Sequence, residues 1–221
     1  MTAFTRDRRN QVIRMPERGH YERDDVYPIV DAALVCHVGF VQDGQPFVIP
    51  TLHARDGDTL LLHGSSASRL MKYAGAGNPL CITMTLLDGI VLARSVFNHS
   101  INYRSAVLFG RGELVTDPDE KLAALERFTE RLLPGRWEDA RQPNRKELKA
   151  TAVVAIPLAS ASAKVRVGPP KDDEDDLALP IWAGVLPLRQ VMDAPLADPK
   201  LAATVALPGY LRDFVAEQRG E

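Results

Sequence analysis

The chain has 221 residues, of which 45% are hydrophobic and 25% are charged, so it has the composition of an ordinary globular protein with a sizeable core. A formal net charge of −2 argues against a general nucleic-acid-binding protein, and no apolar stretch approaches the roughly 20 residues that a membrane-spanning helix needs. Cys36 and Cys81 lie in separate apolar stretches, so we expect reduced core thiols. Because the N-terminus is too charged for a signal peptide, a cytoplasmic protein is predicted.

The first part of the chain predicts an arm followed by a short helix. Residues 1–20 are charged and irregular, which is typical of an extended N-terminal arm. Asp24 and Asp25 then precede Val26, Ile29 and Val30, whose spacing fits one face of a helix with acidic residues at its start. We expect the main domain to cover residues 21–190.

Three Asp-Gly pairs, at residues 43–44, 56–57 and 88–89, separate β-like runs. Asp-Gly tolerates the positive φ angles of tight hairpin turns, so each pair predicts a hairpin. The apolar runs comprise residues 33–41, 46–54, 59–64, 80–87, 90–97 and 106–115. They predict a six-stranded antiparallel sheet, which can remove its exposed edges by closing into a barrel.

The second half of the chain predicts helices and two further strands. Residues 117–135 contain an N-cap Asp, an early Pro and an apolar stripe at helical spacing. A short helix is expected at 145–149, and the runs TAVVAIPL and AKVRV read as strands. The segment from Leu177 onward is Pro-rich, and residues 191–221 are predicted to form a C-terminal tail with a short helix.

The segment LLLHGSSASRLMK, residues 60–72, predicts a strand, a turn and a helix that together suit an anionic group such as phosphate. Gly64 allows close approach of the backbone, hydroxyl groups follow, and Arg69 and Lys72 lie on one helix face. Neither the GxxxxGK[ST] nor the GxGxxG pattern is present. The alternative interpretation is a serine-capped surface helix with two solvated cations.

A second polar cluster lies in SVFNHSINYRSAVLFGRGELV, residues 95–115, just before a predicted strand. Such side chains can form hydrogen bonds to a polar ring and stack on it. The alternative is a polar hairpin loop that leads into the strand. The cluster consists of His99, Ser100, Asn102, Tyr103, Arg104 and Ser105.

The order of these segments resembles the pyridoxamine 5′-phosphate oxidase-like FMN-binding split barrels, and in particular the branch of the nitroimidazole-resistance proteins. The resemblance rests on RGHYERDDVYPIVDAA, HVGFVQDGQPFVIPTLHARDGDTLLLHGSSASRLMK, NYRSAVLFGRGELVTDPDEKLAALERFTERLLPGR, KVRVGPPKDDEDD and WAGVLPL, spanning roughly residues 18–190. It implies a six-stranded antiparallel split β-barrel and a homodimer with FMN at the subunit interface.

The resemblance also implies which residues meet the flavin. Those facing the FMN phosphate would be His63, Gly64, Ser65, Ser66, Ser68, Arg69 and Lys72. Those near the ring would be Pro50, Thr51, Tyr103, Arg104 and Ser105, with Trp182 and Arg189 as C-terminal candidates. The second subunit is expected to complete the site.

The function implied by this resemblance is an FMN-dependent oxidoreductase acting on a small molecule, for which no catalytic acid or base is identified. Pyridoxamine phosphate oxidase activity itself is not expected, because the chain has no histidine after His99 to form the family's C-terminal Arg and His pair. The alternatives are a flavin-binding or flavin-storing protein without turnover, a deazaflavin protein, and a haem-binding split barrel with an axial His37, His53, His63 or His99. These histidines form no HxH or HExxH pair, so no other metal site is predicted.

Overall fold

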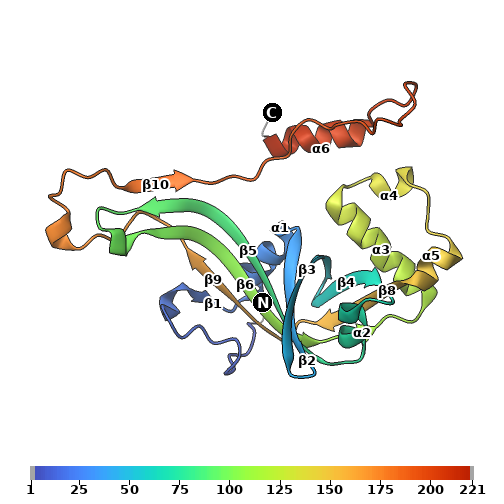
Figure 1. Ribbon diagram of the computed structural model, residues 1–221, viewed down its shortest axis with the longest axis horizontal. Helices are drawn as coiled ribbons and strands as arrows, with labels where there is room; N and C mark the ends of the chain where they lie inside the picture. Colours follow the sequence, from blue (N-terminus) through green and yellow to red (C-terminus); the bar gives the residue numbers. More distant parts are fainter. Residues whose placement is uncertain (1–2, 220–221) are drawn as a thin grey trace.

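The structure, a computed structural model that describes residues 3–219, is built on one antiparallel sheet (Figure 1). Within these residues the strands are β1 (Gly19–His20), β2 (Val35–Gln42), β3 (Gln45–Asp56), β4 (Thr59–Ser65), β5 (Pro79–Leu92), β6 (Ser100–Arg111), β7 (Glu113–Leu114), β8 (Thr151–Pro157), β9 (Ser160–Arg166) and β10 (Gly184–Pro187). They pair in the order β1-β9-β6-β5-β2-β3-β4-β8-β7, with β10 beside β5. The antiparallel class is confirmed, but the sheet has ten strands instead of six and two free ends instead of a closed barrel.

Two of the three predicted Asp-Gly hairpins are present, and the third is not. Asp43 and Gly44 link β2 to β3 with φ angles of 53° and 76°, and Gly57, with φ 55°, links β3 to β4. The pair Asp88-Gly89 instead lies inside β5, where the pairing with β6 shifts at a bulge. The carboxylate of Asp88 binds Arg104 of β6 at 2.7 Å, and the strand continues through the pair. The predicted strands 80–87 and 90–97 are therefore one strand that ends at Leu92, and residues 96–98 form a 3-10 turn instead.

The main core lies on one face of the sheet, as the alternation of β2 demonstrates. Cys36, Val38 and Phe40 are buried, whereas Val35 and Val41, on the other face, are 43% and 56% exposed. Helix α1 (Arg23–Ala32) contributes its apolar side to the same core, as its sequence predicts. The opposite face, which we call the outer face, carries exposed apolar side chains, namely Val35, Val41, Val48 and Leu87.

The remaining helices lie around the sheet. They are α2 (Arg69–Gly75), α3 (Pro118–Leu132), α4 (Arg136–Asp139), α5 (Arg145–Ala150) and α6 (Gly209–Arg219), with 3-10 turns η1 (Pro16–Arg18), η2 (Val96–Asn98) and η3 (Glu174–Asp176). The predicted cap of α3 is present, since the carboxylate of Asp117 accepts hydrogen bonds from two backbone N–H groups of the first turn. Phe128 of α3 packs with Leu61 and Val153 in a second, smaller core. Among the described residues, no helix combines the length and apolar character needed to cross a bilayer.

Arg131 of α3 ties three elements together through backbone carbonyl groups. Its Nε donates to the oxygen of His53 at 2.9 Å, and its Nη1 donates to that of Asp31 at 2.6 Å. Its Nη2 donates to Val30 at 3.1 Å and also to Ala33. The guanidinium thus satisfies the carbonyl groups that the end of α1 leaves without partners in the helix.

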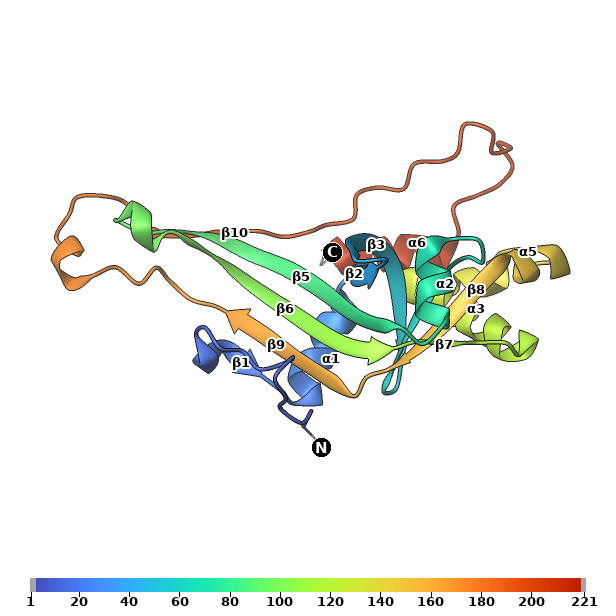
Figure 2. The same ribbon diagram turned by 60° about the horizontal axis from the view of Figure 1, so that its bottom comes forward.

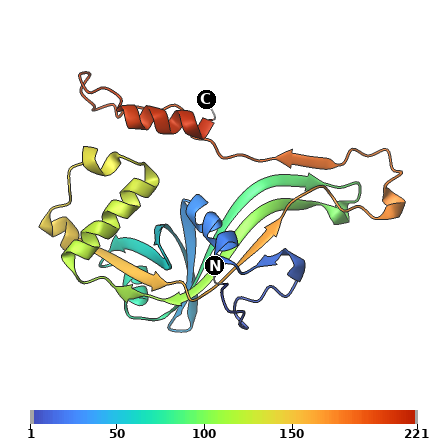
Figure 3. The ribbon, with the colours of Figure 1, turned by 180° about the vertical axis from the view of Figure 1, so that it is seen from behind.

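Strands β5 and β6 extend away from the body of the molecule as a long arm with η2 at its tip (Figure 2). Strand β10 pairs with β5 along this arm, and residues 188–208 then lead back to α6. Figure 3 shows α6 above α4, where the hydroxyl group of Tyr210 donates to Asp139 at 2.6 Å. The tail therefore returns to the body and is anchored there by its terminal helix.

Candidate functional site

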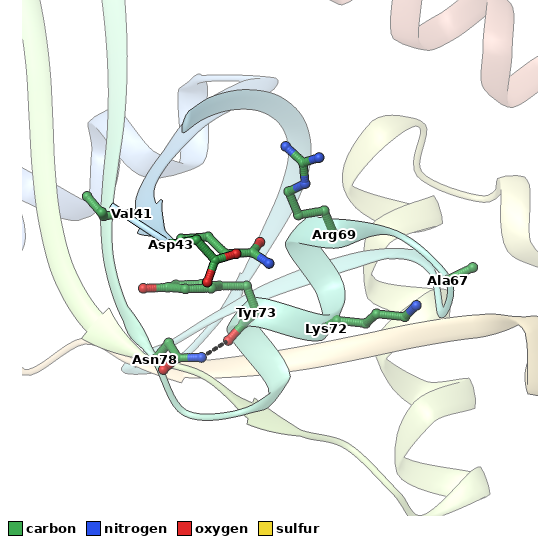
Figure 4. A pocket seen from close by; sticks show the side chains of 8 residues that line it. Val41, Asp43, Ala67, Arg69, Lys72, Tyr73 and Asn78 are labelled. Atoms are coloured by element: carbon green, nitrogen blue, oxygen red, sulfur yellow. Dashed lines mark hydrogen bonds between the residues drawn. The ribbon is translucent and has the colours of Figure 1, made fainter. Parts of the chain in front are cut away.

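A cavity of about 650 Å³ lies between the β2–β3 hairpin and α2 (Figure 4). We call it the polar pocket, because most of its side chains are polar or charged. Its lining residues are Val41, Gln42, Asp43, Ala67, Arg69, Lys72, Tyr73 and Asn78. Asn78 also donates from Nδ2 to the carbonyl group of Tyr73 at 3.0 Å, which fixes the chain where it leaves α2.

An aromatic stack supports the basic side of the polar pocket. The guanidinium of Arg69 lies 4.3 Å from the ring centre of Phe47, and Phe40 packs between Phe47 and Tyr73 at 5.3 and 4.7 Å. Within residues 3–219, neither Arg69 nor Lys72 forms an ion pair with an acidic side chain. The N–H groups of Arg69 and the ammonium group of Lys72 are therefore available to an anion.

The three predicted serines first of all shape the turn between β4 and α2. The Oγ atom of Ser68 caps α2 by accepting from the N–H of Met71 at 3.1 Å, and the Oγ of Ser65 accepts from Ala67 at 3.2 Å. Ser66 donates its backbone N–H to Ala150 at 2.8 Å. The hydroxyl oxygens of Ser65 and Ser68 are thus engaged, while their hydrogens can still be donated to a ligand.

Gly64 has a packing role in this turn. A Cβ atom at this position would come within 3.3 Å of the Cγ of Met71, so the absence of a side chain lets α2 lie close to β4. The predicted strand, turn and helix are therefore present. Of the side chains predicted there to bind phosphate, Arg69 and Lys72 line the polar pocket.

Tyr103, Arg104 and Ser105 lie on β6, and none of them lines the polar pocket of this chain. Arg104 is held by Asp88 through hydrogen bonds of 3.0 and 2.7 Å, which raise the pKa of its guanidinium. Ser105 donates from Oγ to the carbonyl group of Lys164 at 3.2 Å. In the single chain Arg104 and Ser105 therefore stabilise the β5–β6 arm.

Pro50 and Thr51 are neighbours on β3, so their side chains point to opposite faces of the sheet. Pro50 lies opposite His37 and is exposed, whereas Thr51 lies opposite the buried Cys36. Trp182, 68% exposed, precedes β10, and Arg189 is exposed just beyond β10. The predicted flavin-binding residues are thus distributed over separate parts of one chain.

His63 lines a different cavity, of about 330 Å³, which we call the apolar pocket. The cavity lies between the β3–β4 pair and the segment from α3 to α5, and is lined by Leu52, His63, Leu125, Phe128, Thr129, Leu132, Trp137, Arg141, Pro143 and Glu147. The imidazole ring lies edge-on to Phe128, with 4.3 Å between the ring centres. Burial lowers the pKa of His63, which favours the neutral ring.

The other histidines have distinct environments. His53 is buried, its Nε2 lies 2.8 Å from the carbonyl oxygen of Val30, and burial lowers its pKa to about 4. His99 is exposed near the tip of the arm, with Nδ1 2.9 Å from the carbonyl oxygen of Ser95, and His37 is exposed on the outer face. No group of three or more His, Cys, Asp or Glu side chains suited to a metal ion occurs in the described part of the chain.

Sequence reasoning missed four polar or aromatic residues that line the polar pocket, namely Gln42, Asp43, Tyr73 and Asn78. The Asp43-Gly44 pair does signal a hairpin, and Tyr73 directly follows Lys72 on the predicted helix. No local pattern, however, indicates that this hairpin lies against that helix, because the contact depends on how β2 and β3 curve over α2.

Comparison with known proteins identifies the family. The sequence profile of the pyridoxamine 5′-phosphate oxidase family matches residues 22–165. Among curated proteins, none matches the sequence. Among solved structures, the flavocytochrome Anf3 from Azotobacter vinelandii is 43% identical, with a TM-score of 0.89, over 94% of this chain and 96% of that chain.

Two further structures extend this comparison. The FAD and haem binding protein from Mycobacterium smegmatis is 37% identical, with a TM-score of 0.85, over 89% of this chain and 96% of that one. A candidate 5-nitroimidazole antibiotic resistance protein from Bacteroides thetaiotaomicron is 24% identical, covering 66% of this chain and 86% of its own with a TM-score of 0.55, and shares the fold. The predicted family resemblance is confirmed. This chain, with its mainly antiparallel, split-barrel-like sheet, therefore belongs to the pyridoxamine 5′-phosphate oxidase-like family.

Proposed function

We propose that this protein is a flavin-dependent oxidoreductase that works as a homodimer and also binds haem. The flavin binding is supported by the polar pocket, whose Arg69 and Lys72 have no acidic partner among residues 3–219. Two structures that are 43% and 37% identical over most of their length support the combination, since one is named a flavocytochrome and the other an FAD and haem binding protein.

The polar pocket fits the phosphate end of a flavin. Its volume of about 650 Å³ is within the usual range for small-molecule sites, and its two cations outnumber its single carboxylate, Asp43. A flavin supplies hydride and electron transfer when bound, while the protein supplies binding and orientation. We propose FAD in place of the FMN that the sequence predicts, because the 37% identical structure is named for FAD.

The proposed homodimer rests on the outer face. This face carries exposed apolar side chains, including Val35, Val48 and Leu87, which a partner would remove from water. Val41 belongs both to this face and to the lining of the polar pocket, so a flavin bound there would border the interface. By the pairing register, Pro50 and Tyr103 also lie on the outer face, from which they can meet a flavin held by the other subunit.

A cytoplasmic location is also part of the proposal. Cys36 and Cys81 are both free thiols in the structure. Free thiols without a disulfide framework are usual in reducing compartments.

The first experiment is an absorption spectrum of the purified protein, followed by release of the chromophores and their identification by mass. FAD and haem together would support the proposal, and FMN would correct the flavin assignment. A protein that neither carries nor takes up any flavin would refute it. Anaerobic addition of NADH or NADPH then distinguishes an oxidoreductase from a flavin-binding protein without turnover, and light scattering measures the dimer.

Substitution tests the proposed phosphate contact. Charge-assisted hydrogen bonds contribute about 1.5–3 kcal/mol, so we expect Arg69→Ala to weaken flavin binding by roughly 10- to 100-fold. Lys146→Ala, which removes an exposed cation on α5 that does not line the polar pocket, is the matched control and should leave the affinity unchanged. Equal affinities for the two variants would exclude the polar pocket as the phosphate site.

A further inference from the structure

We propose that His63 is an axial ligand of the haem iron and that the apolar pocket receives the porphyrin edge. This inference rests on the haem binding proposed above and adds the site and the ligand. It is independent of the flavin assignment, because His63 and Arg69 line different cavities.

The chemistry of the apolar pocket suits a flat, largely apolar ring. Leu52, Leu125 and Leu132 contribute aliphatic surface, while Phe128 and Trp137 contribute aromatic surface. A porphyrin gains from burying such surface, and its iron needs a nitrogen, sulfur or oxygen ligand. His63 is the histidine in this lining, and its ring is already oriented by the edge-on contact with Phe128.

The imidazole of His63 is in a state suited to ligation. In the part of the chain that the structure describes, neither ring nitrogen makes a hydrogen bond, and burial lowers the pKa of the ring. A neutral imidazole with an unengaged nitrogen is the form that binds iron. His63 can therefore ligate without first losing a proton or breaking a hydrogen bond.

The other histidines are less suited to this role. The Nε2 of His53 is engaged by the carbonyl group of Val30 and lies 3.3 Å from the guanidinium of Arg131. Its Nδ1 has no hydrogen-bond partner but is buried in the core and lines neither cavity. His20, His37 and His99 line neither of the two cavities. Of the five histidines in the sequence, His63 is thus the one that combines an apolar cavity with a free nitrogen.

The guanidinium of Arg141, at the rim of the apolar pocket, can bind the propionate groups of haem. Arg141 lines the cavity and is held by Glu147 through hydrogen bonds of 3.0 and 2.7 Å. A cavity of about 330 Å³ takes only the inner part of a porphyrin, so the propionate groups would remain near the surface. There the guanidinium of Arg141 can exchange its carboxylate partner for a propionate.

The test compares His63→Ala with His37→Ala and His99→Ala, which remove exposed histidines that line neither cavity. Haem content, the Soret band and the electron paramagnetic resonance spectrum are measured after haem reconstitution, and flavin content reports on folding. We expect His63→Ala to lose at least tenfold in haem affinity while it keeps its flavin, and added imidazole to restore the wild-type spectrum. The two control variants should show the same haem content, Soret band and electron paramagnetic resonance spectrum as the wild-type protein.

Two further outcomes distinguish a failure of His63 as the haem ligand from a failure of haem binding itself. If His63→Ala binds haem with unchanged affinity and spectrum, His63 is not a ligand, although haem binding itself stands. If the wild-type protein takes up no haem, the haem part of the proposed function fails, and this inference fails with it. Should His63→Ala not fold, His63→Met keeps most of the volume. It must change the spectrum if residue 63 binds iron, and an unchanged spectrum would overturn the inference.

Discussion

Replacing Arg131 by Met would test how far the fold depends on a single guanidinium. Its guanidinium donates to the backbone oxygens of Val30, Asp31 and His53 at 2.6 to 3.1 Å, and also to that of Ala33. A hydrogen bond that involves a charged group contributes about 1.5–3 kcal/mol, and buried acceptors left without partners add their own desolvation cost. Since water can reach part of this site, we expect a loss of about 3–5 kcal/mol in the free energy of unfolding.

The assay is urea unfolding of wild type, R131M and R131K, followed by tryptophan fluorescence. Lys keeps the charge but not the planar fork, so R131K should lie between the other two. The matched control is R127M on the same helix, where Arg127 reaches Asp56 at 3.1 Å and both side chains are about half exposed. That pair should contribute less than about 1 kcal/mol. If R131M destabilises the protein no more than R127M, the proposed link between α1, β3 and α3 is wrong.

Three further predictions follow from local contacts. His53 has a folded pKa of about 4 against the usual 6.5, so the unfolded chain binds the proton first. Stability should therefore fall by about 2 kcal/mol from pH 7 to pH 5, and His53→Asn should reduce this slope in urea titrations at the two pH values. Asp117→Ala removes the cap of α3 and should cost about 1 kcal/mol in thermal unfolding, whereas Asp117→Asn should cost much less. Gly112→Ala would bring a Cβ within 2.4 Å of Val154 and 2.8 Å of the carbonyl oxygen of Ala74. We therefore expect the free energy of unfolding to fall by about 1–3 kcal/mol, and an unchanged melting temperature would contradict this close packing.

Features with a local cause could be predicted from the sequence. Asp117 caps α3 and Ser68 caps α2 because each side chain reaches a backbone N–H two or three residues ahead. Asp43-Gly44 forms a hairpin through its own positive φ angles. Asp88-Gly89 has the same sequence, but its carboxylate meets Arg104 across the sheet and β10 pairs beside it, so the outcome is decided by partners distant in the chain.

In the candidate site, too, only the features with a local cause could be predicted from the sequence. Arg69 and Lys72 were found because they lie three residues apart on one short helix. His63 was grouped with them through the family resemblance, yet it lies on β4 and lines the cavity beside α3. The contribution of the β2–β3 hairpin to the polar pocket could not be read from any local pattern.

The two pockets differ in how much of the chain must be in place before each exists. The polar pocket is made from residues 41–78, whereas the apolar pocket draws on residues between 52 and 147. Closing a shorter loop costs less chain entropy, and contacts close in sequence form sooner. We therefore expect the polar pocket to assemble early in folding and the apolar pocket only after α3, α4 and α5 have docked on the sheet. A chain interrupted just after Asn78 would already contain every residue that lines the polar pocket, but it would lack eight of the ten that line the apolar pocket.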